Sequence, residues 1–333
     1  MLASTLPSAL ERGSLDLCQL KRFWAAIQLN DSDALSTDYH KNRLLFDALG
    51  AGFHQGLNFL YAHQPTFEEF EHWITSVVGQ PSNDTIQRFN NYFLDLPPPA
   101  IIQEKLKKID HYPNALNAEQ LNSWHRNGYT VVKNAVDLNA CKAAEQAIWQ
   151  YIKAAPEKPE SWYGKNDSQI MIELIQHPAI QSNRDSLRIH KAFSQLWGTS
   201  NLWCSADRCS FHPPQKPGYP FPGPDLHWDM DLRQPETFST QGILYLTNTS
   251  EEQGALTLVP GFHHKLKDWL ADLEDNQDPQ QQNLHALGSK AIAANAGDLI
   301  IWHHALPHGS RPNLTQQPRI AQYINFYPFN FKS

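Results

Sequence analysis

Three consecutive prolines at positions 97–99 constrain the fold of this chain more than any other feature of its sequence. A proline has no backbone N–H to donate and its ring fixes φ, so a helix ends at such a run, which is itself a stiff spacer. Helix-like spacing precedes these prolines and strand-like patterns follow them. We therefore predict a helical N-terminal domain over residues 1–95, a proline-containing linker over 96–117 and a second domain over 118–333.

The first of these domains shows the apolar spacing of amphipathic helices. Apolar residues recur at intervals of three and four between 39 and 63, which predicts one helix there. Thr66 followed by Glu69 has the pattern of a capping box, and Gly79 that of a helix end, which predicts a second helix. Residues 84–94 predict a third. None of these residues has catalytic spacing, so we interpret the domain as one that packs against the rest of the chain or a partner.

The pattern changes to strands in the second domain. Asn117 caps a predicted short helix, residues 138–152 predict another, and from about residue 200 short apolar segments alternate with Gly and Pro. The predicted strands cover residues 202–212, 241–248, 254–259, 298–303 and 319–327. Many short strands of this kind are typical of a β-sandwich or a barrel.

Charge and composition exclude several classes of function. Lys and Arg number 27 against 34 Asp and Glu, a net charge of −7, which gives no overall attraction to nucleic acid or to an anionic membrane. The four cysteines include no C-x-x-C pair, which excludes a zinc finger or a redox dithiol. No leader pattern stands at the start, and no apolar run reaches the ~18 residues of a membrane span. We expect a soluble cytoplasmic protein without nucleic-acid or membrane partners.

One short motif has the spacing of a metal site. His227 and Asp229 are two residues apart, so on a strand both side chains point to the same face and can bind one metal ion. A third, distant ligand would complete the two-histidine, one-carboxylate triad of non-haem iron oxygenases. Alone the motif is weak, since a chain with 16 histidines readily contains a chance match. The alternative is a plain hydrogen bond between the two side chains.

Candidate partners for this pair lie near the C-terminus. A histidine-rich turn offers His303, His304 and His308, and Arg319 begins the strand that follows. An arginine on an inward strand face is costly to bury unless it meets an anion. A carboxylate is a suitable anion, because the planar guanidinium fork binds both of its oxygens. Ser310 can add a hydroxyl to the same carboxylate.

Taken in order, these motifs resemble a known family. The chain carries Trp124-His-Arg-Asn-Gly128-Tyr-Thr-Val-Val, His227-x-Asp229, Gly254-Ala-Leu-Thr-Leu-Val-Pro-Gly-Phe-His263, Gly297-Asp-Leu, His308-Gly-Ser310 and Arg319. This set resembles the phytanoyl-CoA dioxygenase (PhyH) family of Fe(II)/2-oxoglutarate-dependent oxygenases over about residues 117–330. One departure is Phe262, where the family often has Ser.

The resemblance implies a fold and a site. The fold is mainly β with helices, a double-stranded β-helix (a cupin-like jelly roll) preceded by a small all-α N-terminal domain. The residues implied to bind Fe(II) are His227, Asp229 and His308. Arg319 and Ser310 are implied to hold the far carboxylate of the cosubstrate 2-oxoglutarate, and Tyr245 is a weaker cosubstrate candidate.

Family alignment also ranks the remaining histidines. Spacing to Arg319 favours His308 as the distal ligand. The histidines interpreted instead as packed, hydrogen-bonded or surface groups are His263, His264, His303 and His304. His212 precedes two prolines and has no partner that the sequence identifies.

The implied activity is that of a dioxygenase that uses Fe(II), 2-oxoglutarate and O2. We expect it to hydroxylate an unactivated C–H bond of a small molecule, such as an amino acid or a biosynthetic intermediate, and to release succinate and CO2. The candidates for its substrate pocket are Arg208, Trp228, Arg233 and Trp302. Core packing is the commoner role of a Trp. The sequence leaves open the substrate, hydroxylation against desaturation or cyclisation, and the oligomeric state.

Three other functions remain open at this point. The same chemistry on a substrate tethered to a carrier protein or CoA would use the N-terminal domain as a docking module. A non-enzymatic jelly-roll binding protein would keep the metal site as a relic, and a zinc hydrolase would have no use for 2-oxoglutarate. The presence of all three candidate ligands together with Arg319 favours the oxygenase.

Overall fold

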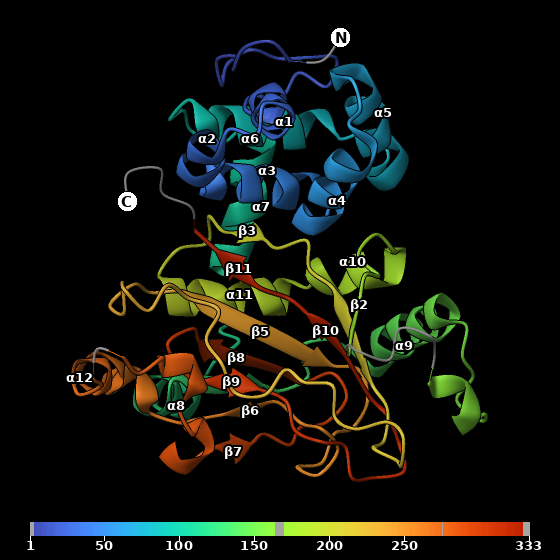
Figure 1. The fold of residues 1–333 in the computed structure, drawn as a ribbon, viewed down its shortest axis with the longest axis vertical. Coiled ribbons are helices and arrows are strands. Elements are labelled where there is room, and N and C mark those ends of the chain that lie inside the picture. Colours follow the sequence, from blue (N-terminus) through green and yellow to red (C-terminus); the bar gives the residue numbers. More distant parts are fainter. Residues whose placement is uncertain (1–2, 164–169, 275, 329–333) are drawn as a thin grey trace. The chain divides into compact units, whose positions relative to one another are not determined.

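Two compact units make up the chain, and neither is continuous in sequence. The computed structural model describes residues 3–163, 170–274 and 276–328 (Figure 1). The first unit comprises Met1–Tyr112, Thr199–Ala206 and Tyr327–Ser333, and the second comprises Pro113–Gly198 and Asp207–Phe326. Within the described ranges, no helix has the length and apolar character that a membrane span requires.

The first unit is mainly helical. Its helices are α1 (Leu20–Gln28), α2 (Ser32–Thr37), α3 (Tyr39–Leu49), α4 (Phe53–His63), α5 (Phe67–Val78), α6 (Asn83–Phe93) and α7 (Ala100–His111). Two short strands, β3 (Trp203–Cys204) and β11 (Phe326–Tyr327), pair with each other. The buried faces of the helices share one hydrophobic cluster, in which Phe23 and Phe46 pack edge to face with their ring centroids 5.3 Å apart.

Residues 39–63, predicted as one helix, form the two helices α3 and α4. Gly50 ends α3 with φ at +73°, a left-handed conformation that favours glycine, and its N–H bonds to the Asp47 carbonyl. The apolar spacing continues through both helices. Periodicity alone therefore does not reveal the break.

Two predicted helix starts are confirmed by their side-chain caps. The Glu69 N–H donates to Thr66 Oγ1 at 3.4 Å, and the Thr66 N–H donates back to the Glu69 carboxylate at 2.7 Å, so α5 begins with a complete capping box. In the second unit, Asn117 Oδ1 accepts from the Gln120 N–H at 2.9 Å and begins α8 (Ala118–Asn127).

The predicted linker over residues 96–117 is wrong in its central part. Helix α7 occupies Ala100–His111 and belongs to the helical unit, whose boundary falls after Tyr112. Pro99 is the N-cap of this helix, a place where a proline is tolerated because the first N–H groups of a helix have no intrahelical partner. Ile102 and Ile109, seven residues apart on one face, are buried. The proline run thus separates two helices of one unit.

The helical unit also needs residues from far along the chain. The Asp47 side chain on α3, which is only 1% exposed, accepts a hydrogen bond from the Ala206 N–H at 2.7 Å and one from the Tyr327 hydroxyl at 2.6 Å. Trp203 lies in the core cluster of this unit. The Arg88 guanidinium packs on its ring, with the guanidinium carbon 3.9 Å from the ring centroid. A linear division into N-terminal and C-terminal domains therefore does not describe the molecule.

The second unit combines helices with antiparallel sheets. Its remaining helices are α9 (Leu138–Ile152), α10 (Pro178–Arg184), α11 (Leu187–Trp197) and α12 (Leu266–Ala271). The larger sheet has the order β1-β8-β5-β10-β4-β2, and its strands are β1 (Tyr129–Val132), β2 (Met171–Ile172), β4 (Cys209–His212), β5 (Thr240–Tyr245), β8 (Leu299–His303) and β10 (Arg319–Tyr323). A smaller sheet has the order β7-β6-β9, with β6 (Thr257–Leu258), β7 (Lys290–Ala291) and β9 (His308–Gly309).

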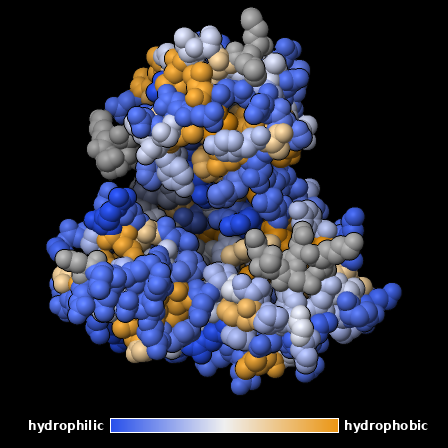
Figure 2. All heavy atoms as spheres, viewed as in Figure 1, coloured by the Kyte–Doolittle hydropathy of each residue, from blue (hydrophilic) through white to orange (hydrophobic). Residues whose placement is uncertain are grey.

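The two sheets share a core. Ile243 on β5, Ile300 on β8 and Leu258 on β6 are buried in one hydrophobic cluster. Figure 2 shows that hydrophilic residues dominate the visible surface, with apolar residues in small groups. The larger and the smaller sheet therefore bury apolar side chains in a common core.

The coarse fold prediction is confirmed as a mixture of helices and antiparallel sheets, whereas the jelly-roll connectivity stays a prediction. Two of the predicted strands are each divided into two shorter ones. Residues 202–212 split into β3 and β4, and residues 319–327 into β10 and β11. The chain passes from one unit to the other at residues 206–207 and 326–327, within these predicted strands. No local pattern marks such a passage.

Replacing Asp47 with Ala tests the link between the helical unit and its distant segments. The change removes the acceptor of two buried hydrogen bonds to a charged group, so we expect unfolding to need about 3 kcal/mol less free energy. Urea denaturation of the purified variant measures this loss. Asp33→Ala, which removes an exposed carboxylate from the same unit, should change stability by no more than about 0.5 kcal/mol. Equal effects of the two changes would contradict this account.

Candidate active site

A reciprocal backbone bridge brings the two halves of the predicted metal site together. The His227 N–H donates to the His308 carbonyl at 2.9 Å, and the His308 N–H donates to the His227 carbonyl at 3.0 Å. Residues that exchange both bonds in an antiparallel pair lie directly opposite each other. The two imidazole rings consequently lie with their centroids 4.8 Å apart, although a long stretch of chain separates them.

Backbone carbonyls orient both rings. His227 Nδ1 lies 2.7 Å from the Asp225 carbonyl, and His308 Nδ1 lies 3.1 Å from the Leu306 carbonyl. A carbonyl only accepts hydrogen bonds, so each Nδ1 carries a proton, and each ring, when neutral, presents the lone pair of Nε2 to a metal ion. Second interactions of this kind are what hold a histidine in a metal-binding orientation.

Both Nε2 atoms face the same carboxylate. Asp229 Oδ1 lies 3.4 Å from His227 Nε2, and Asp229 Oδ2 lies 3.3 Å from His308 Nε2. One donor atom from each of these residues falls within 4.8 Å of the others, and they are the one such group of His, Cys, Asp and Glu side chains within the described ranges. Two imidazoles and one carboxylate form the donor set of a facial triad, so the residues fit a divalent iron ion.

The pKa values of the carboxylate and of one histidine in this group are shifted in opposite directions. Hydrogen bonds from His227 and His308 hold the pKa of the Asp229 carboxyl well below its usual range, so Asp229 is ionised. Burial opposes the charged form of His227, but hydrogen bonds with Asp229 and with the Asp225 carbonyl outweigh burial and raise its pKa. The Asp229 side chain is 55% exposed, whereas that of His308 is 6% exposed, so the group opens to solvent on the Asp229 side.

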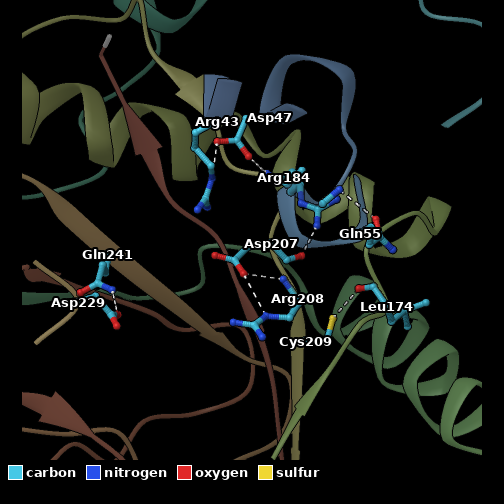
Figure 3. A network of polar contacts seen from close by, with 12 residues as sticks. Arg43, Asp47, Gln55, Leu174, Arg184, Asp207, Arg208, Cys209, Asp229 and Gln241 are labelled. Atoms are coloured by element: carbon cyan, nitrogen blue, oxygen red, sulfur yellow. Dashed lines mark hydrogen bonds and ion pairs between the residues drawn. The ribbon is translucent and has the colours of Figure 1, made fainter. Parts of the chain in front are cut away.

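Sequence reasoning missed Gln241, which orients the carboxylate. Gln241 Nε2 donates to Asp229 Oδ2 at 2.7 Å, as Figure 3 shows, and its Oε1 accepts from Trp302 Nε1 at 3.0 Å. Gln241 and Trp302 are directly opposite each other in the β5–β8 pair, and the Trp302 ring packs 5.2 Å from that of His308. Only the strand register reveals this chain of contacts, and the sequence offers no signal for the register.

Arg319 lies fully buried on β10 with neutral partners. Its Nη1 donates to the Gly254 carbonyl at 2.7 Å and to Ser310 Oγ at 2.9 Å. Its Nη2 donates to Ser210 Oγ at 2.8 Å, a contact that the sequence did not predict. Ser310 is thus beside Arg319, as expected. No carboxylate of the described residues forms an ion pair with Arg319, so the positive charge inside this unit lacks a counterion from the chain's described part.

Tyr245 and Trp228, two of the weaker site candidates, are buried in the second unit. Tyr245 lies on the same sheet, but its hydroxyl already donates to the Ile292 carbonyl at 3.1 Å and accepts from the Leu256 N–H at 2.8 Å. Trp228 packs in the core, with its Nε1 donating to the Ala305 carbonyl at 2.9 Å. In the structure, the single N–H or O–H donor of each side chain is thus already engaged by a backbone carbonyl.

Three further pocket candidates lie in different surroundings. Trp302 is 2% exposed, and its Nε1 donates a hydrogen bond to Gln241, the residue that orients the Asp229 carboxylate. Arg233 is a surface residue paired with Asp231 at 2.8 Å. Arg208 is partly exposed and lies 3.9 Å from the Asp207 carboxylate (Figure 3).

The neighbouring histidines stay outside the donor group. His304 Nε2 lies 2.6 Å from the Thr237 carbonyl, and His303 Nδ1 accepts from the Ala305 N–H at 3.1 Å. Burial lowers the pKa of His303 to about 3. His263 and His264 both approach the His125 carbonyl. The structure thus brings His308, and neither His303 nor His304, to the H-x-D pair.

Comparisons with known proteins identify relatives in sequence. A family model described as phytanoyl-CoA dioxygenase (PhyH) matches residues 124–321, more than half of the chain. A protein from Dictyostelium discoideum named after this dioxygenase is 21% identical over 257 residues, which are 62% of this chain and 74% of that protein. "Ava biosynthesis cluster protein O" from Aspergillus versicolor is 21% identical over 264 residues, 70% of this chain and 85% of that protein.

Solved structures give more distant likenesses. The non-heme alpha ketoglutarate dependent epimerase SnoN from nogalamycin biosynthesis is 17% identical with a TM-score of 0.46, over 62% of this chain and 81% of SnoN. EctD from S. alaskensis, solved with 2-oxoglutarate and 5-hydroxyectoine, is 17% identical with a TM-score of 0.44, over 64% of this chain and 76% of EctD.

Replacing Gln241 with Leu tests its role in orienting the carboxylate. The change removes the donor to Asp229 and leaves the three candidate ligands in place. We expect the dissociation constant for Mn(II) to rise about 10- to 100-fold, the usual effect of losing such a support. Titration followed by the EPR signal of free Mn(II) measures it. Gln234→Leu, an exposed glutamine of the preceding loop, is the matched control. An unchanged dissociation constant in Gln241→Leu would contradict the role.

Metal affinity should fall as the pH is lowered. Because the pKa of His227 is raised in the metal-free protein, protonation begins above its ordinary value of 6.5 and removes the Nε2 lone pair. The lowered pKa of Asp229 keeps the carboxylate ionised through the same range. We expect Mn(II) affinity to fall toward about tenfold per pH unit below the raised pKa, for one competing proton. A constant affinity between pH 8 and pH 6 would refute this.

Proposed function

The chain belongs to the phytanoyl-CoA dioxygenase family, and we propose that it is an Fe(II)- and 2-oxoglutarate-dependent oxygenase that hydroxylates a small molecule. The observation that carries the proposal is the environment of Arg319. Its guanidinium is 0% exposed and held by hydroxyls and a carbonyl, with no ion pair to a described carboxylate. A buried charge of this kind calls for an anion from outside the chain.

The metal ligands in this proposal are His227, Asp229 and His308. They would hold Fe(II) through the two Nε2 atoms and one carboxylate oxygen, which leaves coordination positions for a cosubstrate and O2. When bound there, iron would supply O2 activation coupled to oxidative decarboxylation of 2-oxoglutarate, so that one oxygen atom would go to a substrate C–H bond, the other to succinate, and CO2 would be released.

The residues of the chain position and shield this chemistry. The Asp225 and Leu306 carbonyls keep both imidazoles in the tautomer that presents Nε2, and Gln241 restrains Asp229. Arg319 and Ser310 bind the far carboxylate of 2-oxoglutarate through the guanidinium and the hydroxyl. The surroundings of Arg319 are buried, so this interaction is stronger than it would be in water.

The delivery of the substrate is a separate hypothesis. A substrate carried on CoA or on a carrier protein would use the helical unit as a docking module. Deleting residues 1–95 is a poor test, because Asp47 and the core that encloses Trp203 would be lost with them. Substitutions at exposed apolar positions, such as Tyr61 on α4, leave the unit intact and compare KM for free and tethered substrates.

Anaerobic titration of the Fe(II)-loaded protein with 2-oxoglutarate tests the proposed function. We expect the visible charge-transfer band of the iron chelate to develop in the wild type. Arg319→Ala should need about 100-fold more 2-oxoglutarate, since a charged bidentate partner is lost. Arg126→Ala, which removes an exposed arginine, is the control and should titrate like the wild type.

Two results would count against the oxygenase. Folded wild-type protein that binds iron but gives no band would point to the binding protein with a relic site. Hydrolysis of a substrate by the zinc-loaded wild type, without 2-oxoglutarate, would point to the zinc hydrolase. Asp229→Ala should need a higher Fe(II) concentration than the wild type before the band develops, because it removes the carboxylate ligand.

A further inference from the structure

His212 is a buried histidine that the proposed mechanism does not use. Its side chain lies at the end of β4, the residue is 1% exposed, and its Nδ1 atom has no hydrogen-bond partner. Burial, together with the positive charge of Arg319, lowers the pKa of His212 to about 3, so the ring is neutral. Buried polar atoms without a partner are rare in proteins, and each one calls for an explanation.

The strand register places His212 beside Arg319. The two residues are directly opposite each other in the β4–β10 pair, and Ser210 is opposite Ala321 in the same ladder. Directly opposed residues, and residues two positions apart on a strand, point to the same face of a sheet. His212, Ser210 and Arg319 therefore project together toward the interior that holds Ser310, where Ser210 and Ser310 both accept from the guanidinium.

Gly254 makes room for this arrangement. Its φ is +63°, and a Cβ at this position would collide with Nδ1 of His212. Its carbonyl also accepts the hydrogen bond from Arg319 Nη1. A larger residue at position 254 would displace the imidazole from the guanidinium. The Phe221 ring stacks on the other side of His212, with the ring centroids 5.5 Å apart.

The cluster around Arg319 has more hydrogen-bonding groups than partners. A guanidinium has five N–H donors, of which three have partners in Gly254, Ser310 and Ser210. Arg319 Nε is buried without a partner, as is His212 Nδ1. A cation is excluded here by the charge of Arg319. A carboxylate can accept from both residues at once, because each of its oxygens carries two lone pairs.

We propose that His212 is a further binding residue for the far carboxylate of 2-oxoglutarate, to which its imidazole donates one N–H beside Arg319. This inference rests on the proposed function and deepens it. A neutral donor opposite the arginine adds a second direction from which the carboxylate is held. It therefore favours five-carbon 2-oxo dicarboxylates over 2-oxo acids that end in a methyl group.

Calorimetric titration of the Mn(II)-loaded protein with 2-oxoglutarate tests this proposal without relying on turnover. His212→Phe keeps an aromatic ring and loses the donor, and we expect it to weaken 2-oxoglutarate about 10- to 100-fold. His212→Asn and His212→Gln return an amide N–H near the positions of Nδ1 and Nε2, and one of them should recover affinity to within about threefold of the wild type. Titration with 2-oxobutyrate, which lacks the far carboxylate, should not distinguish wild type from His212→Phe.

The outcomes separate this inference from the proposed function. Wild type that binds no 2-oxoglutarate refutes both. Wild type and His212→Phe that bind 2-oxoglutarate equally refute the inference alone, with a water molecule as the partner of His212. Equal losses for 2-oxoglutarate and 2-oxobutyrate, or a loss of Mn(II) binding, indicate a structural role and also refute it.

If His212→Phe does not fold, the wild type still decides the question. In Zn(II)-loaded protein labelled with 15N-histidine, the ring N–H of His212 is assigned by its absence in His212→Asn. Addition of 2-oxoglutarate should move this proton resonance downfield, whereas 2-oxobutyrate should not. An unmoved resonance under saturating 2-oxoglutarate refutes the inference.

Discussion

The candidate site depends on the backbone bridge between His227 and His308. Two backbone hydrogen bonds join segments that are distant in sequence and bring His308 to the His227–Asp229 pair. The bridge lies at β9, on the edge of the smaller sheet, so it extends that sheet by one residue pair. Because the ligands are tied through the main chain, their separation does not depend on flexible side chains alone.

The same unit contains two polar groups that call for ligands of opposite charge, a cation at the metal group and an anion at Arg319. Around the metal group, carbonyls and an amide hold ligands that are already paired with one another. Around Arg319, hydroxyls and a carbonyl solvate a positive charge without neutralising it. The first environment is complete once a cation binds, and the second once an anion binds. A cosubstrate with a chelating end and a distant carboxylate meets both demands.

The helical unit is built partly from segments that follow it in the chain, so it cannot be removed without exposing them. Its core takes in Trp203, and its buried carboxylate Asp47 holds Ala206 and Tyr327. The strands β4 and β10, which carry His212 and Arg319, start or end within a few residues of these anchors. Loss of the helical unit would therefore free the chain next to two strands of the candidate site.

The sequence by itself determined the chemistry of the candidate site and the local helix signals. The H-x-D spacing, the histidine-rich turn and Arg319 were identifiable because residue type and order along the chain carry that information. The capping box at Thr66 and the N-cap at Asn117 were predictable because their hydrogen bonds span only three residues. Residues 100–111 were misassigned because a proline run ends one helix and begins the next equally well.

Only the tertiary structure decided which residues support the site. Gln241 contacts Asp229, and His212 faces Arg319, through strand pairings between residues far apart in sequence. The structure also shows that Trp302, Trp228 and Tyr245 are buried, with hydrogen bonds from Trp228 and Tyr245 to backbone carbonyls. The physical reason is that a strand pattern specifies which faces are apolar, whereas the partner strand and its register are set by the packing of the whole unit.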